Sequence, residues 1–391
     1  FVQAKAVLLA TGGGPTMYRF HTPSGDKSCD GLAMALRFGL PLRDMEMVQF
    51  HPTGLLAGAH TRMTGTVLEE GLRGAGGHLL DGDGNRFMHR YDPRDERATR
   101  DIVSRAIFAE MRAGRTTPNG GVYISMEHLG AENVRRQFKG MVERCADCGF
   151  DLAAGRVEVV PTAHYMMGGV EFAPDCTTER EGLFVAGEDS GGVHGANRLG
   201  GNGVANSTVF GGIAGDAMAN WLRGGGTFGE PDADALATSL QRARVPFANS
   251  NVHGVATNLE DVRERLYATM WDDAGIVRDA AGLSRAADVL TGLTGELDRY
   301  RLPSAARDPA FNMTWHDWLN LSSLVDVSRV IVRAAQAREN SRGAHYRSDF
   351  PEPGDLTTST YTRVRAANDG KLAVEAVPVA FTRVRPGESL I

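Results

Sequence analysis

The stretch that decides the fold lies at residues 1–14, which read FVQAKAVLLATGGG. Its apolar run at 6–10 predicts a buried strand, and the three glycines after it predict a tight turn. A helix is expected at 30–39, with Asp30 as its N-cap and Gly39 as its stop. Because the sequence starts directly on a core strand, we expect a preceding segment to be missing from it.

The composition excludes several classes of protein. The chain has 391 residues, 42% of them hydrophobic, which suggests two or three domains. Its formal net charge of −6 gives no reason to expect a nucleic-acid partner. No apolar run approaches the roughly 18 residues of a membrane helix, so direct membrane insertion is not expected. The four cysteines are sparse for this length, which is typical of a reducing compartment.

Hydrophobic periodicity predicts the remaining elements. A helix is expected at 100–111, and one rich in small residues at 204–222. Apolar residues three or four apart predict two further helices, at 259–270 and 319–334. A hairpin is expected around Asn368-Asp369-Gly370 near the end of the chain.

Arg198 is the first candidate site residue. It stands in residues 193–203, VHGANRLGGNG, where the glycines are expected to leave its guanidinium exposed beside bare backbone. That setting suits bidentate recognition of a carboxylate. The amides that follow lead into a helix, whose N-terminus can stabilise an anion. An ordinary arginine in a surface loop is the open alternative.

Two histidines and one charged run add further candidates. His51 is restricted by the proline that follows it, and His164 stands beside Tyr165 and two methionines. His51 could donate a hydrogen bond to a carboxylate, although a structural role stays open, and the stretch around His164 is either a ligand-lined wall or a plain buried strand. Glu70 and Arg73 are three residues apart and can pair on one helical turn. Together with Arg100 they form either a proton path or a solvated face.

The order of these stretches resembles that of the succinate dehydrogenase and fumarate reductase flavoprotein family, which includes L-aspartate oxidase. The resemblance runs from residue 4 to about residue 352. The matching motifs are ATGG at 10–13, QFHPTG at 49–54, EGLRG at 70–74, RDIVSR at 100–105, HYMMGG at 164–169, GLFVAGE at 182–188, HGANRL at 194–199 and SRGAH at 341–345.

The resemblance implies a reaction and roles for the residues. In this family a flavin N5 exchanges a hydride with a carbon of a C4 dicarboxylate, and an arginine exchanges the proton. By motif, Arg100 is that arginine, and Glu70 and Arg73 form its relay to solvent. His51, His164 and Arg198 are then the clamp on the substrate carboxylates, which agrees with the need of two anionic groups for fixed donors.

The resemblance also implies a cofactor, a domain plan and partners. The FAD contacts are expected from Thr11, Gly12, Gly13, Asp30, Gly187, Glu188, Asn202, Gly203 and Val204. The fold class is α/β and α+β multidomain: a partial Rossmann-like FAD-binding domain at 1–49 and 161–222, an inserted α+β capping domain at 50–160, a helical domain at 223–350 and a tail with a β-hairpin at 351–391. An iron–sulfur subunit is the expected partner, with the protein cytoplasmic or peripheral at the cytoplasmic membrane face through partner subunits.

Three departures from the family pattern affect this interpretation. The N-terminal Gly-rich dinucleotide motif is absent, so an FAD-binding segment is expected to be missing. Glu69 stands where a threonine commonly contacts a substrate carboxylate, and its charge puts succinate as substrate in doubt. Asn202-Gly203-Val204 replaces the usual Asn-Ser-Leu, which removes a hydroxyl. L-aspartate oxidase, another dicarboxylate dehydrogenase and a non-catalytic partner-binding remnant stay open as alternatives.

Overall fold

The computed structural model describes residues 1–58, 61, 63–248, 258–367 and 370–388. These residues form two compact units. Unit 1 contains residues 1–19, 25–47 and 166–391, and unit 2 contains residues 20–24 and 48–165. The chain therefore enters unit 2 twice. No helix among the described residues combines the length and the apolar character that crossing a membrane requires.

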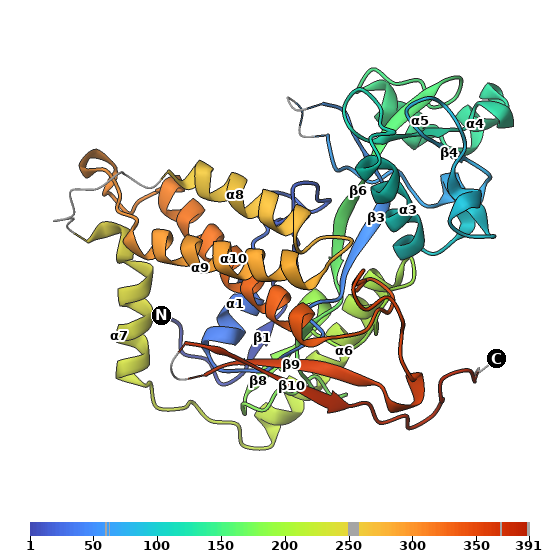
Figure 1. The fold of residues 1–391 in the computed structure, drawn as a ribbon. Coiled ribbons are helices and arrows are strands. Elements are labelled where there is room, and N and C mark those ends of the chain that lie inside the picture. Colours follow the sequence, from blue (N-terminus) through green and yellow to red (C-terminus); the bar gives the residue numbers. More distant parts are fainter. Residues whose placement is uncertain (59–60, 62, 249–257, 368–369, 389–391) are drawn as a thin grey trace. The chain divides into compact units, whose positions relative to one another are not determined.

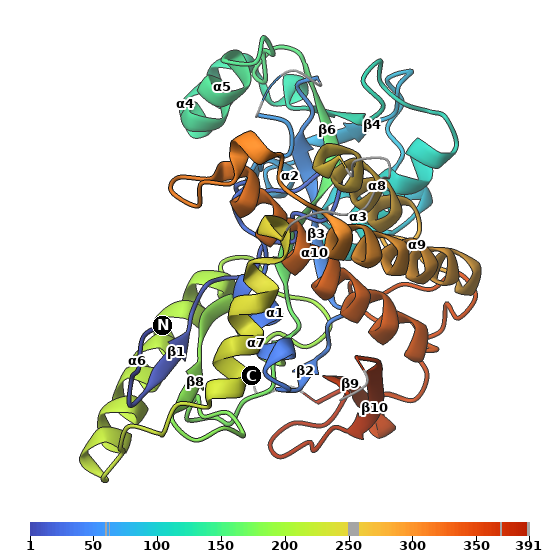
Figure 2. The same ribbon diagram turned by 90° about the vertical axis from the view of Figure 1, so that its left-hand side faces the viewer.

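The first sheet of unit 1 has two parallel strands, β1 (Val7–Leu9) and β8 (Leu183–Val185). Val7 lies opposite Leu183 and Leu9 opposite Val185. The long helix α6 (Asn202–Arg223) runs beside these strands (Figure 2). The predicted strand at 6–10 is therefore present, but the prediction that it is buried is wrong, because Val7 is 46% exposed.

Helix α1 (Asp30–Arg37) follows the Gly-rich turn as predicted. Asp30 is its first residue rather than its N-cap, because Cys29 holds the cap position in the left-handed conformation, with φ 55°. Gly39 comes just after the helix with a φ of +82°, which glycine adopts without strain. The helix buries Leu32 and Leu36, as its amphipathic pattern requires.

The helical part of unit 1 packs around α10, which contacts α8 and α9 (Figure 1). The helices are α7 (Ala233–Ala243), α8 (Leu259–Asp272), α9 (Ala280–Arg299) and α10 (Met313–Ala337). The predicted helices at 259–270 and 319–334 are thus confirmed, each extended by a few residues. Side chains of Asn258, Asp279 and Asn312 accept hydrogen bonds from first-turn amides, which is the usual way to begin a helix.

The second sheet of unit 1 has the strand order β10-β9-β2-β7. Its strands are β2 (Leu42–Arg43), β7 (Gly169–Val170), β9 (Thr360–Ala366) and β10 (Leu372–Pro378). The antiparallel pair β9 and β10 confirms the predicted hairpin. The predicted turn residues Asn368 and Asp369 lie outside the described residues.

A buried charge network joins these parts of unit 1. The Glu46 carboxylate is fully buried and accepts hydrogen bonds from Arg338 Nε at 2.5 Å and from the Thr362 hydroxyl at 2.6 Å. The backbone oxygen of Glu46 accepts a third bond, from Arg278 Nη1 at 2.8 Å. Burial raises the pKa of the neighbouring Asp44 to about 6, and the negative charge of Glu46 contributes to that rise. The buried carboxylate is satisfied only while both of its donors, Arg338 and Thr362, are in place.

Unit 2 contains a four-stranded sheet of order β3-β6-β5-β4, with helix α3 against β3. The strands are β3 (Val48–Leu55), β4 (His78–Leu80), β5 (Val122–Ser125) and β6 (Arg156–Met166). The helices are α2 (Gly71–Gly74), α3 (Arg100–Arg112), α4 (Ala131–Gln137) and α5 (Lys139–Ala146). Ile107, Val122, Ile124 and Val159 are among the buried residues of its core. The predicted helix at 100–111 is confirmed.

We expect Glu46→Ala to lower the free energy of unfolding by about 3–5 kcal/mol, because the buried guanidinium of Arg338 loses its 2.5 Å carboxylate partner and keeps only the longer carboxylate contact to Asp44 at 3.5 Å. Urea unfolding at pH 7 measures this loss. The matched control is Glu375→Ala in β10, where an exposed carboxylate pairs with Arg363 at 3.2 Å. The control should change stability by about 0.5 kcal/mol or less. Equal effects of the two substitutions would contradict the assignment.

Candidate functional site

A continuous chain of charged side chains lies in unit 2. Arg100 begins α3, and its Nε and Nη2 donate to Glu70 Oε2 at 3.3 Å and 3.0 Å. The other carboxylate oxygen of Glu70 accepts a hydrogen bond from Arg73 Nη2 at 3.0 Å. Arg73 is buried and continues to the backbone oxygen of Glu96, at 2.7 Å. The structure thus places Glu70 between two guanidinium groups, as the three-residue spacing of Glu70 and Arg73 predicts.

These contacts shift the proton affinities of the chain. Burial raises the pKa of Glu70, but the hydrogen bonds and charges of Arg100 and Arg73 outweigh it and hold that pKa below its ordinary value. Burial lowers the pKa of Arg73, and the Glu70 carboxylate offsets only part of that effect. Glu70 is therefore an anion at neutral pH, and it links two arginines of different exposure.

Strand β3 brings three polar side chains to one face. Gln49, His51 and Thr53 alternate along the strand, so they point to the same side of the sheet. All three are almost completely buried. Gln49 Oε1 accepts a hydrogen bond from Arg100 Nη1 at 3.1 Å, which connects this face to the charged chain.

The two candidate histidines are neighbours in unit 2. His51 lies on β3 and His164 on the adjacent strand β6, with ring centroids 5.5 Å apart in an edge-to-face arrangement. His51 Nδ1 accepts a hydrogen bond from the Thr53 backbone N–H at 3.3 Å. His164 Nδ1 lies 2.9 Å from the Thr22 hydroxyl. The structure therefore brings together His51 and His164, and separately Glu70, Arg73 and Arg100.

Glu69 lies beside this arrangement. It directly precedes Glu70, its side chain is exposed, and its backbone oxygen accepts a hydrogen bond from Leu72 N at 3.2 Å. Because the Glu69 carboxylate is exposed and solvated, it forms no buried ion pair. Its negative charge affects neighbouring groups only through electrostatic repulsion or attraction that water and salt screen.

Arg198 belongs to unit 1, in the loop before α6. It is 6% exposed, so the expectation of an exposed guanidinium is wrong. Its backbone N–H donates to the Met167 sulfur at 3.0 Å, and its Nη1 donates to the Leu199 oxygen at 3.2 Å. Burial, together with the charge of Arg198, lowers the pKa of His194 to about 4. His194 is therefore neutral at physiological pH, while Arg198 keeps its charge.

The candidate cofactor residues of unit 1 gather at one edge of the β1–β8 sheet. Because the two strands are parallel, the turns after Leu9 and after Val185 lie at the same carboxyl edge, where α/β sheets bind ligands. The backbone N–H and the hydroxyl of Thr11 both donate to the Asp189 carboxylate, and Glu188 Oε1 accepts from Met166 N at 2.8 Å. Asp189, which adjoins the Gly-Glu pair of the motif and was not among the predicted residues, thus holds Thr11 at this edge.

The glycines of this edge serve the packing of the protein itself. A Cβ at Gly13 would collide with the Glu188 carboxyl group, and one at Gly31 would collide with Thr11 and Asp189. The first turn of α6 is more open: Asn202 and Val204 are exposed and Gly203 is half-buried. The N-terminus of this 22-residue helix carries partial positive charge, so this edge fits a polar, anionic cofactor such as a flavin nucleotide.

Two sequence families match the chain. The FAD binding domain family matches residues 1–204, and the fumarate reductase flavoprotein C-terminal family matches residues 263–390.

Curated relatives match most of the chain. It is 38% identical over 90% of its length to a fumarate reductase (CoM/CoB) subunit from Methanothermobacter marburgensis, of which it covers 62%. It is 37% identical over 99% of its length to the fumarate reductase flavoprotein subunit of Mycobacterium tuberculosis, of which it covers 68%. The chain thus spans about three fifths to two thirds of the length of these relatives.

Solved structures match at a similar level. A FrdA variant of E. coli quinol fumarate reductase superposes with a TM-score of 0.86 at 33% identity. The superposition covers 98% of this chain and 67% of that one.

Stability should fall as the pH rises through the acidic range. Burial raises the pKa of Glu188 from 4.5 to about 7 and that of Asp189 from 3.8 to about 6. Between about pH 4 and pH 7 the folded chain therefore binds more protons than the unfolded chain, and the free energy of unfolding decreases with pH. Glu188→Gln should remove about 2 kcal/mol of the difference between pH 5 and pH 8.

Urea titrations of the chain without added cofactor measure this difference. Glu230→Gln, at an exposed carboxylate of the same unit, is the control and should leave the pH dependence unchanged. A Glu188→Gln variant whose stability varies with pH as in the parent would contradict the assignment.

Proposed function

Because the chain belongs to the succinate dehydrogenase and fumarate reductase flavoprotein family, we propose that it carries the dicarboxylate site of an FAD-dependent oxidoreductase. The reaction interconverts the C–C single and double bonds of a C4 dicarboxylate such as succinate or fumarate. FAD, the cofactor of its FAD binding domain, supplies the hydride chemistry when bound. Fumarate reductase or succinate dehydrogenase activity is the form of this reaction that the site supports best.

The observation that carries the proposal is the hydrogen bonding of Arg100. Its guanidinium is held by Glu70 and Gln49, and Glu70 continues to Arg73. A proton delivered from Arg100 can thus be replaced through the carboxylate of Glu70, which is partly open to solvent, with a side chain 42% exposed. Hydrogen bonds that fix the donor in advance lower the cost of reaching the transition state.

The remaining candidate residues would bind the two carboxylates of the substrate. His51 and His164 offer imidazole N–H groups in unit 2, and Arg198 offers a guanidinium in unit 1. We assign these three residues to the two substrate carboxylates, since fixed donors at a desolvated site suit anionic groups. In this assignment unit 2 acts as the capping domain, and the carboxyl edge of the β1–β8 sheet holds the flavin through Thr11, Gly13, Glu188 and the first turn of α6.

Glu69 favours a second candidate substrate. Its exposed carboxylate stands next to Glu70 and disfavours a second anion nearby. A dicarboxylate that carries an ammonium group would be repelled less, so an L-aspartate oxidase activity is the alternative. We therefore include aspartate in the test.

We also propose that polypeptide outside this chain completes the nucleotide-binding half of the protein. The relatives contain sequence to which this chain has no counterpart. Parallel sheets are normally buried on both faces, whereas in β1 Val7 is exposed, Leu8 and Leu9 are only half-buried, and the strand pairs, among the described residues, only with β8. The far side of β8 is bridged by Thr177, which leaves β1 as the edge where a strand can be added.

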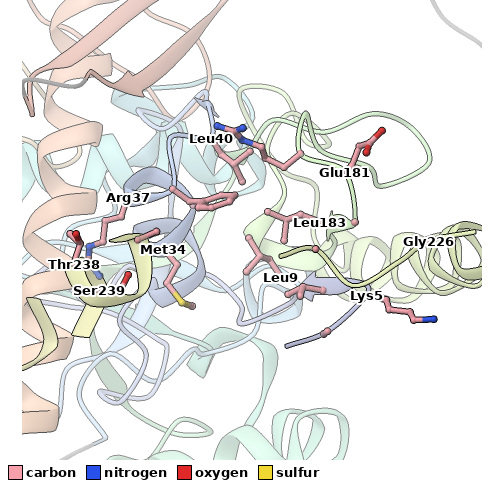
Figure 3. Close-up of a pocket in the computed structure, with 18 of the residues that line it drawn as sticks. Lys5, Leu9, Met34, Arg37, Leu40, Glu181, Leu183, Gly226, Thr238 and Ser239 are labelled. Carbon is pink, nitrogen blue, oxygen red and sulfur yellow. The ribbon is translucent and has the colours of Figure 1, made fainter. Parts of the chain in front are cut away.

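A large apolar cavity adjoins this edge. It measures about 1480 Å³, and its walls come from β1, β8, α1, the end of α6 and α7. Figure 3 shows Leu9 and Leu183 of the strands and Met34 of α1 around it. Phe38, another lining residue, is 57% exposed. An apolar surface of this size beside an open strand suits a strand and helix of the missing half.

An iron–sulfur subunit is the partner we propose for the completed protein. Both relatives are named as subunits, one of a CoM/CoB fumarate reductase and the other as the flavoprotein component of a fumarate reductase. In such an assembly electrons pass between the flavin and the partner, and the protein lies at the cytoplasmic face of the membrane through its partners.

The activity test uses the chain combined with the polypeptide that corresponds to the unmatched part of its relatives, together with FAD. Arg100→Lys should reduce turnover with fumarate or succinate by at least about 100-fold, because the donor can no longer be held by Glu70 and Gln49 at once. Thermal stability should change little. Steady-state rates with reduced and oxidised artificial electron carriers measure the effect.

Arg105→Lys is the matched control, one turn along α3, where the guanidinium pairs with Asp101 at 3.2 Å. It should keep near-normal rates. Parental activity with aspartate alone would favour the oxidase, and failure of the combined protein to bind flavin would favour a non-catalytic role. Near-normal turnover of Arg100→Lys would refute the role of this residue.

The proposed contact between the apolar cavity beside β1 and the added polypeptide gives a separate prediction. Phe38→Glu should weaken the binding of the added polypeptide by at least tenfold, roughly the effect of removing one anchor residue, while the chain itself still folds. Phe311→Glu is the control, since Phe311 is fully exposed and does not line the cavity. Isothermal titration of the two parts gives the dissociation constants. Equal affinities for the parent and Phe38→Glu would rule out this surface.

A further inference from the structure

The partners of the two site histidines come from different parts of the chain. His51 Nδ1 accepts from the backbone N–H of Thr53 at 3.3 Å, two residues along the same strand. The Thr53 hydroxyl, which donates to the Leu68 oxygen at 2.9 Å, lies 3.5 Å from the same nitrogen.

His164 has a side-chain hydroxyl in the same place. Thr22 Oγ1 lies 2.9 Å from its Nδ1, and a hydroxyl can donate or accept. When the hydroxyl donates, the neutral ring carries its proton on Nε2. When it accepts, Nδ1 is protonated, as in the imidazolium form or the other neutral tautomer.

The backbone holds Thr22 firmly at this position. His21 bridges to Ala163 in a parallel arrangement, Thr22 N donates to the Ala163 oxygen at 2.9 Å, and Ala163 N donates to the Phe20 oxygen at 2.8 Å. Ala163 directly precedes His164 on β6. Because both backbones are paired at this point, little conformational entropy is lost when the hydroxyl meets the ring.

We infer that Thr22 is a positioning residue that orients His164 and whose hydroxyl, by donating to Nδ1, keeps the proton of the neutral ring on Nε2. The inference rests on the proposed function, in which His164 donates to a substrate carboxylate. Neutral imidazole with a proton on Nε2 and imidazolium both serve as donors, and the Thr22 hydroxyl can bond to either.

The arrangement has a consequence for binding. The His164 ring can gain or lose its second proton without losing the hydrogen bond to Thr22, because the hydroxyl can donate or accept. Without the hydroxyl, Nδ1 and Nε2 of His164 would compete for the proton, and part of the population would present a lone pair to the anion.

The test compares Thr22→Val, which keeps the shape and removes the hydroxyl, with Thr22→Ser, which retains it. We expect Thr22→Val to raise KM for the dicarboxylate about tenfold, the effect of one lost hydrogen bond, with a smaller change in kcat. Thr22→Ser should stay within about twofold of the parent. Thr162→Val is the control, because the Thr162 hydroxyl on the same strand bonds to the Gly65 oxygen at 3.4 Å.

A spectroscopic readout makes the test independent of turnover. In histidine-selective ¹⁵N spectra, assigned with a His164→Gln variant, the parent should show His164 with a protonated Nε2. Thr22→Val should move both ring nitrogens toward the averaged signals of mixed tautomers, and Thr22→Ser should restore the parental signals. This measurement needs no substrate and no electron carrier.

The outcomes distinguish a failure of the proposed function from a failure of the role assigned to Thr22. A parent that is inactive on every dicarboxylate but shows the expected shifts would reject the proposed function and keep the role of Thr22 toward the ring. An active parent whose KM and ring signals are unchanged in Thr22→Val would overturn the inference. A rise in KM that Thr22→Ser does not reverse would also overturn it, since it would indicate a structural effect.

Discussion

The buried carboxylate of Glu46 is the constraint on which unit 1 depends. A fully buried anion must be satisfied by donors, and here they come from segments far apart in the sequence: Arg338 after α10 and Thr362 in β9, with Arg278 on the backbone oxygen. The carboxylate ties the helical part to the C-terminal sheet, because displacing either one removes a donor from a buried charge. Such a network specifies one arrangement even if it adds little net stability.

The candidate site combines two different electrostatic devices. The chain from Arg100 through Glu70 to Arg73 carries full charges, and its middle member is kept anionic by the guanidinium groups on both sides. The imidazoles of His51 and His164 are instead held by hydrogen bonds to threonine residues. One device suits the movement of a proton, and the other suits the binding of an anion without a large fixed charge.

The sequence predicted what depends on local pattern. Apolar spacing located α3, α8 and α10, and the three-residue spacing of Glu70 and Arg73 predicted their contact, which is confirmed, while their roles remain predictions. Properties that depend on distant neighbours were harder. The apolar run around Val7 indicated burial, but nothing within the described chain covers it on one side. Arg198 was expected to be exposed because glycines flank it, yet the surrounding fold buries it. Thr22 lies 142 residues from His164 in sequence, and no spacing rule links such a pair.

The five residues at 20–24 make unit 2 discontinuous in sequence. A recombination event or an engineered graft that moved residues 48–165 as a cassette would transfer the strands and both histidines, but would leave the Thr22 hydroxyl behind. The transferred unit would keep its core and lose the hydroxyl that contacts the His164 ring. Exchange of this unit between related flavoproteins is therefore constrained by a short upstream segment, and a successful donor must bring two pieces of chain rather than one.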